Sequence, residues 1–105
     1  MKLRQLEYFC AVAEAKSISA AARELHVAQP PISRQIAQLE EELGVQLFLR
    51  GSKGMVLTDA GQNLYQQTQQ IFQDIRRVED SVRSVLNVPW TMPWGPMYIQ
   101  PPAVI

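Results

Sequence analysis

The polar side chains best suited to bind a ligand gather between Gln29 and Gln38. Amide, hydroxyl and guanidinium groups occur there at Gln29, Ser33, Arg34 and Gln38. These are the groups that proteins use to hydrogen-bond base edges and phosphates in DNA. No acidic residue lies in this stretch, so no carboxylate would repel a phosphate. These groups are therefore compatible with nucleic-acid contact.

A helix that begins at Gln29 must position these groups. Pro30 and Pro31 suit its first turn, because the fixed φ is helical and the missing N–H groups would be unpaired there anyway. Upstream, the Ala-rich run 20–25 predicts a short helix with Ser19 as its N-cap. The joint between the two helices is only residues 26–28, which indicates a helix-turn-helix.

The second helix has one apolar side and one polar side. At about 100° per residue, a stripe forms from Ile32, Ile36, Leu39 and Leu43, and we expect it to face the core. The opposite side is small, polar and cationic in its N-terminal half, and a major groove admits such a helix end. That side carries Pro30, Arg34, Ala37 and Glu41, flanked by Ser33 and Gln38. An ordinary amphipathic helix pair in a helical bundle would show the same spacing, and the spacing alone does not separate the two.

Two short strand-like runs follow Gly44, the expected end of that helix. They are residues 47–50 and 55–58, separated by a Gly-rich turn, and together they predict a β-wing. Arg50 and Lys53 are expected at its base and tip, where they could reach phosphate or the minor groove. The alternative is that both are solvated loop charges.

A long helix is predicted from residue 59, with Thr58 as its N-cap and Asp59 in the first turn. Tyr65 and Phe72 are expected to lean toward the winged domain. The remaining apolar positions form a heptad seam that predicts pairing with a second subunit. The seam consists of Leu64, Thr68, Ile71, Ile75, Val78, Val82 and Val85.

Several of these motifs together resemble the N-terminal DNA-binding domain of LysR-type transcriptional regulators. The resemblance spans residues 3–86, and the double proline is similar to regulators of aromatic-compound catabolism. The motifs are Ala20-Ala21-Ala22 with Leu25, Gln29-Pro30-Pro31-Ile32-Ser33-Arg34-Gln35-Ile36, Leu39-Glu40-Glu41-Glu42-Leu43-Gly44, Leu47-Phe48 with Arg50, and Leu57-Thr58-Asp59-Ala60-Gly61.

This resemblance implies a mainly α fold: a winged helix-turn-helix of three helices and a two-stranded wing over residues 1–58, then a dimerisation linker helix over 59–87. It implies that a homodimer, or a higher oligomer, binds two half-sites in double-stranded DNA, with helix 29–43 in the major groove and wing 50–54 near the minor groove. The expected DNA-binding residues are Gln29, Pro30, Pro31, Ser33, Arg34, Gln38, Arg50 and Lys53. The expected dimerisation residues are Leu64, Ile71, Ile75, Val78, Val82 and Val85.

One position departs from the family pattern. Ala28 stands where the family most often has Ser, and a serine there could cap the recognition helix and reach a phosphate. Some family members resemble this chain in carrying Ala. The change lowers the expected DNA affinity and leaves the interpretation in place.

Composition restricts the other functions open to the chain. Among 105 residues, ten Lys and Arg balance ten Asp and Glu, so DNA binding would depend on local geometry rather than on bulk charge. The single cysteine, Cys10, excludes an intrachain disulfide, is expected in the core and fits a reducing cytoplasm. No signal peptide or membrane span is expected.

Enzyme and cofactor chemistry are not expected either. His26 is the only histidine, and no catalytic pair, phosphate loop or metal-ligand spacing accompanies it. Residues 40–42 are interpreted as a solvated acidic helix face. The competing interpretation is a dimeric helical interaction module that does not bind DNA, which neutral charge and Ala28 favour slightly.

The last stretch, residues 88–105, holds five of the seven prolines, both tryptophans and no charge. It predicts either an aromatic docking peptide or, as we prefer, an end without fixed structure. An effector domain is not expected within this chain. We therefore expect no small-molecule inducer site in it, and DNA binding that does not respond to an inducer.

Overall fold

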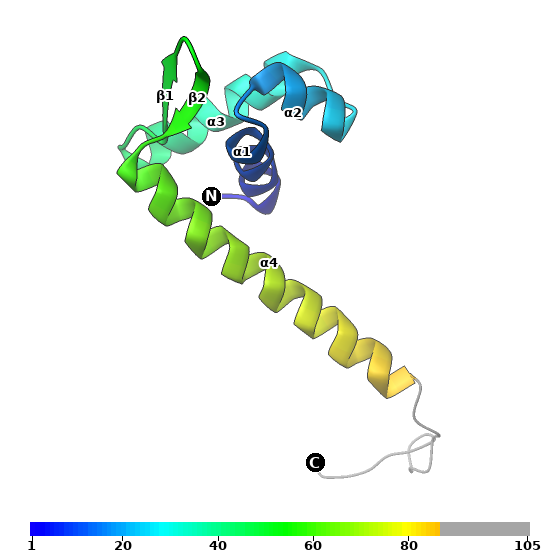
Figure 1. The fold of residues 1–105 in the computed structure, drawn as a ribbon. Helices are drawn as coiled ribbons and strands as arrows, with labels where there is room; N and C mark the ends of the chain where they lie inside the picture. The colour runs from blue at the N-terminus through cyan, green and yellow to red at the C-terminus, as the bar shows by residue number, and fades with distance from the viewer. Residues whose placement is uncertain (87–105) are drawn as a thin grey trace. The chain divides into compact units, whose positions relative to one another are not determined.

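A computed structural model of the protein describes residues 1–86. Residues 1–71 form one compact unit, and residue 72 begins a second. The elements are α1 (Leu3–Ala15), α2 (Ile18–Leu25), α3 (Gln29–Leu43), β1 (Phe48–Gly51), β2 (Gly54–Leu57) and α4 (Asp59–Leu86), as Figure 1 shows. This order confirms the predicted mainly α winged helix-turn-helix and long final helix. The predicted tail, 88–105, lies outside the described residues.

One face of α1 is the centre of the core in the first unit. This helix packs against α2, α3 and β2, and Phe9 and Val12 are fully buried. The ring of Phe9 lies 5.3 Å from that of Phe48, centroid to centroid, with the two planes tilted by 51°. A tilted pair at this distance adds attraction to the area that the rings bury. The core thus fixes the start of the wing against the first helix.

The apolar stripe of α3 is buried along most of its length. Ile32, Ile36 and Leu39 are at most 5% exposed, which confirms the predicted core side. Leu43 is different: its side chain is 40% exposed. It is the last residue of α3, and the chain turns away at Gly44, which has the predicted left-handed φ of +71°. No further helical turn is therefore left to cover Leu43.

Helix α2 begins two residues earlier than predicted, because the capping residue is Ser17 and not Ser19. The backbone N–H of Ala20 donates to Ser17 Oγ at 3.1 Å. Ser17 has the extended conformation of an N-cap, whereas Ser19 lies inside the first turn with its hydroxyl oxygen 3.0 Å from Ser17 Oγ. Ile18 is consequently the first residue of the helix.

The joint between α2 and α3 is closed by a left-handed residue. His26 has φ +59°, and the next N–H, that of Val27, donates to the carbonyl of Ala22 at 3.0 Å. This is the Schellman arrangement, here built without glycine. Ala28 then occupies the N-cap of α3 without a side-chain hydrogen bond to the helix. The joint has the predicted length and holds the only histidine.

The wing is an antiparallel pair with a two-residue turn at Ser52 and Lys53. Its register pairs Phe48 with Leu57 at the base and Gly51 with Gly54 at the turn. Arg50 pairs with Met55, next to the turn, so the prediction that it lies at the base is wrong. The N–H of Met55 also donates to the carbonyl of Lys16 at 3.1 Å, which ties the wing to the end of α1.

Helix α4 starts as predicted. Thr58 Oγ1 accepts from the N–H of Gly61 at 3.0 Å, and Asp59 lies in the first turn. Within the first unit, Tyr65 donates through its hydroxyl to Glu14 Oε2 at 2.8 Å, which confirms that its side chain leans toward the winged domain. Thr68 is fully buried there, so it does not belong to a solvent-facing seam.

The remaining seam positions differ in exposure. Leu64, Ile71 and Ile75 are partly buried. Val78, Val82 and Val85 are 54%, 58% and 56% exposed, respectively. The apolar side chains furthest along the seam are thus open to solvent. No helix within residues 1–86 has the length and apolar character that crossing a membrane would require.

Gly54 and Gly51 flank the same turn and give a matched pair of variants. Gly54 has φ +95°, and a Cβ there would collide with the carbonyl oxygen of Lys16, whereas a Cβ at Gly51 meets nothing. We expect Gly54→Ala to lose at least about 1 kcal/mol of unfolding free energy, since both strain and the collision disfavour it. We expect Gly51→Ala to change it by less than about 0.5 kcal/mol. Urea unfolding measures both, and equal losses would contradict this account of the turn.

Candidate nucleic-acid interface

The first turns of α3 present the predicted polar surface. Gln29, Pro30, Arg34 and Gln38 are exposed, and Ser33 is half-buried beside them. Pro31, the other predicted contact residue, is also half-buried. The first turn of α3 contains no acidic residue. One helix therefore carries six of the eight predicted DNA-binding residues, and its first turn is free of acidic side chains.

The two prolines change what this helix start can bind. A helix leaves the N–H groups of its first residues unpaired, and anions bind to them. Pro30 and Pro31 have no N–H, so Gln29 supplies the one N–H among the first three residues of α3. The start of α3 consequently offers hydrocarbon rings where another helix would offer phosphate donors. Apolar surface of this kind suits the methyl group of thymine in a major groove.

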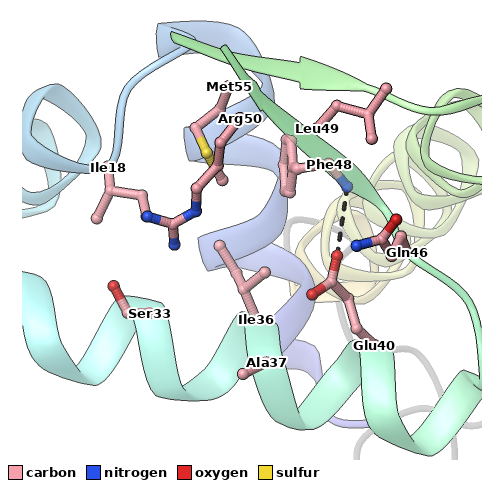
Figure 2. Close-up of a pocket in the computed structure, with 10 residues that line it drawn as sticks. All are labelled: Ile18, Ser33, Ile36, Ala37, Glu40, Gln46, Phe48, Leu49, Arg50 and Met55. Carbon is pink, nitrogen blue, oxygen red and sulfur yellow. Dashed lines mark hydrogen bonds between the residues drawn. The ribbon is translucent and has the colours of Figure 1, made fainter.

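Arg50 lies beside this surface. A cleft of about 290 Å³ separates α3 from the wing, with Ser33 and Ala37 on one side and Phe48, Leu49 and Arg50 on the other. Figure 2 shows the guanidinium of Arg50 between Ile18 and Ser33, so the side chain reaches from β1 toward α2 and α3. One wing cation, Arg50, therefore lies beside the exposed surface of α3.

Lys53 is placed differently. It lies in the turn of the wing and lines another depression of about 340 Å³, together with Lys16 and Gln62. Arg50 does not line that depression, and Lys53 does not line the cleft beside α3. The two wing cations therefore line different depressions. The sequence did not show this, because the register of the two strands was unknown.

The interpretation of Glu40 as part of a solvated acidic face is wrong. Its side chain is half-buried, and Oε2 accepts from the N–H of Leu47 at 2.7 Å. It also accepts from the N–H of Phe48 at 3.3 Å, which is the bond drawn in Figure 2. Glu41 and Glu42 are exposed, as expected. A carboxylate that bonds backbone groups seven and eight residues away leaves no periodic signal in the sequence.

The titratable groups with shifted pKa values lie away from this surface. Burial raises the pKa of Cys10 to about 11, and the nearby carboxylate of Glu14 adds to the rise, while a hydrogen bond from Gln69 opposes it. Glu14 also raises the pKa of Tyr65 through their hydrogen bond. Cys10 is 7% exposed, as predicted for a core thiol, and a protonated, buried thiol is a poor nucleophile. Within residues 1–86, no three His, Cys, Asp or Glu side chains are grouped to hold a metal ion.

Comparisons with known proteins all identify the same family. Residues 3–62 match the model described as "Bacterial regulatory helix-turn-helix protein, lysR family". The chain is 46% identical over 85 residues to the probable cat1 operon transcriptional activator of Acinetobacter lwoffii, and 48% identical over 86 residues to the regulator ClcR of Pseudomonas putida. These alignments cover 81% and 80% of this chain but only 28% and 29% of those proteins. The chain thus spans less than a third of the length of the curated relatives it matches.

A solved structure matches over nearly its whole length. It is the crystal structure of the BenM DNA-binding domain in complex with catB site 1 DNA, with a TM-score of 0.80 and 41% identity. The match covers 84% of this chain and 99% of that one. The winged helix-turn-helix with its long final helix is therefore a known arrangement.

The raised pKa of Cys10 predicts a pH dependence. Between about pH 9 and 11 the unfolded chain releases the thiol proton while the folded chain keeps it, so stability falls as pH rises through that window. We expect urea unfolding between pH 8 and 10.5 to show a smaller loss of stability in Cys10→Ala than in the wild type. If the unfolding free energies of the two proteins fall in parallel as pH rises, the raised pKa of Cys10 is contradicted.

Proposed function

The chain belongs to the lysR family of bacterial regulatory helix-turn-helix proteins, and from this premise we propose that it is a sequence-specific DNA-binding transcriptional regulator. The observation that carries the proposal is the exposed, acid-free start of α3, with Arg34 at its centre. Such a surface fits a major groove, because its donors and its apolar rings both meet base edges there.

The proposed contacts divide into a reading set and a holding set. Side chains on α3 read base edges, whereas the wing cations bind the backbone or the minor groove. In this arrangement Arg50 binds the backbone of the DNA strand that lies against the wing and α3. Lys53 contacts DNA from the turn of the wing. The full set is Gln29, Pro30, Pro31, Ser33, Arg34, Gln38, Arg50 and Lys53.

We also propose that the protein works as a homodimer in the bacterial cytoplasm. Residues 1–58 carry the DNA contacts, and residues 59–87 pair with a second copy. The exposed Val78, Val82 and Val85 support this, since solvent-facing valines at heptad spacing have a natural partner in a second helix. Two copies on a two-fold axis read two half-sites, which offsets the absence of net positive charge. The pairing residues are Leu64, Ile71, Ile75, Val78, Val82 and Val85.

A dimeric helical interaction module is the second candidate. It is favoured by the zero net charge and by an α3 that begins without a side-chain cap at Ala28. Such a module would pair through α4 and would select no DNA sequence. DNA selection therefore separates the two functions.

Arg34→Ala tests the reading helix. We expect the wild-type chain to select a two-fold symmetric sequence from a library of randomised duplexes. Arg34→Ala should weaken binding to the selected duplex by about tenfold or more, because one charged contact to a base edge is lost. Fluorescence anisotropy at several salt concentrations measures the affinity and its dependence on salt.

Arg76→Ala removes an exposed cation of α4 and is the control, which should bind like the wild type. Failure of the wild type to select any sequence would favour the interaction module.

Two aspartates in the seam test dimerisation. Ile75→Asp with Val78→Asp places charges in the apolar contact, so sedimentation should show a monomer that has lost most affinity for the selected duplex. Gln73→Asp with Ser84→Asp adds the same charge on the opposite side of α4 and should leave the dimer intact. A dimer in the seam variant would refute this pairing surface.

A further inference from the structure

The carboxylate of Glu40 joins the recognition helix to the wing. It lies on α3, two residues beyond Gln38, and accepts from the N–H groups of Leu47 and Phe48 at 2.7 and 3.3 Å. Figure 2 shows it directly below the first residue of β1. Bonds in which the acceptor is ionised are roughly twice as strong as neutral ones, so this contact strongly restricts where the wing starts.

The same peptide is held from its other side by the start of α4. Thr58 donates through Oγ1 to the carbonyl of Gln46 at 2.6 Å, and its N–H donates to the carbonyl of Leu47 at 3.0 Å. A Cβ at Gly61 would collide with that second carbonyl, so α4 approaches it closely. Residues 46–48 are thus bound on one side by α3 and on the other by α4. We call this segment the junction peptide.

We propose that Glu40 is a positioning residue for DNA binding: by fixing the junction peptide, it sets the wing so that Arg50 stays beside Ser33. The inference rests on the proposed function. Arg50 is only two residues beyond Phe48, the second N–H that Glu40 binds. A rotation of the wing at its base would therefore move the guanidinium away from α3.

The charge of Glu40 and its proposed positioning role affect DNA binding in opposite directions. A carboxylate on the recognition helix repels phosphate, so its removal by itself should strengthen binding. A positioning role predicts that its removal weakens binding. The direction of the change separates the two effects before any magnitude is considered.

The test compares Glu40→Ala with Glu41→Ala, using the full chain and the duplex that the wild type selects. Both variants remove one negative charge from the same turn of α3, but Glu40 accepts the hydrogen bonds of the junction peptide, whereas Glu41 is exposed. We expect Glu40→Ala to weaken binding at least about tenfold. Glu41→Ala should bind as tightly as the wild type or more tightly. Glu40→Gln keeps one acceptor oxygen and should recover part of the affinity.

Double variants distinguish positioning from general loss of structure. If Glu40 acts by placing Arg50, then Arg50→Ala costs affinity in the wild type but little in the Glu40→Ala background. Arg34→Ala, by contrast, should keep its full cost in both backgrounds. Amide exchange measured by NMR gives an independent check, since the Leu47 and Phe48 amides should exchange faster in Glu40→Ala and not in Glu41→Ala.

Each outcome decides the matter. Unchanged affinity in Glu40→Ala overturns the inference, as does a full Arg50→Ala cost in that background. If Glu40→Ala does not fold, the same cycle with Glu40→Gln applies, and full additivity there overturns it as well. A wild type that selects no duplex defeats the proposed function itself, which is a different result from a wild type that binds and variants that bind equally.

Discussion

The backbone hydrogen bonds at residues 46–48 are the constraint on which the candidate DNA surface depends. Three elements meet at this short segment: α3 through Glu40, the wing through Phe48, and α4 through Thr58. The ring of Phe48 packs on Phe9 in addition, which anchors the segment in the core. Polar and apolar contacts thus fix the same few residues. Helix α3, the wing and the start of α4 are therefore connected through the same segment within the first unit.

The ends of the elements around α3 were predictable because they follow from local rules. Pro30 and Pro31 mark a helix start and Gly44 a helix end, and neither depends on distant contacts. The wing turn was predictable from its glycines for the same reason. The start of α2 was placed wrongly because Ser17 and Ser19 are equally good capping residues by type. The hydrogen bond that Ser17 accepts from Ala20, and the extended backbone of Ser17, separate them in the structure.

The parts of the site that escaped prediction depend on contacts between distant segments. Three consecutive apolar residues at 47–49 hide the alternation of β1, so the sequence could not show which cleft Arg50 faces. Glu40 stands in an acidic run that resembles a solvated helix face, and its role needs Leu47 and Phe48 to be close in space. Thr68 fits a heptad position, yet the core of its own domain covers it completely. Local pattern therefore predicted the elements, and packing decided the roles of single side chains.

The double proline at the start of α3 has a consequence for the kind of chemical difference the protein can detect. Pyrrolidine rings cannot donate a hydrogen bond, so at this end of the helix they respond to shape and hydrocarbon contact alone. A methyl group in the major groove presents the same hydrocarbon whether thymine or 5-methylcytosine carries it. If these rings contact base edges as proposed, a methylated cytosine would present the same hydrocarbon to them as a thymine does, so binding would depend on cytosine methylation as well as on base sequence.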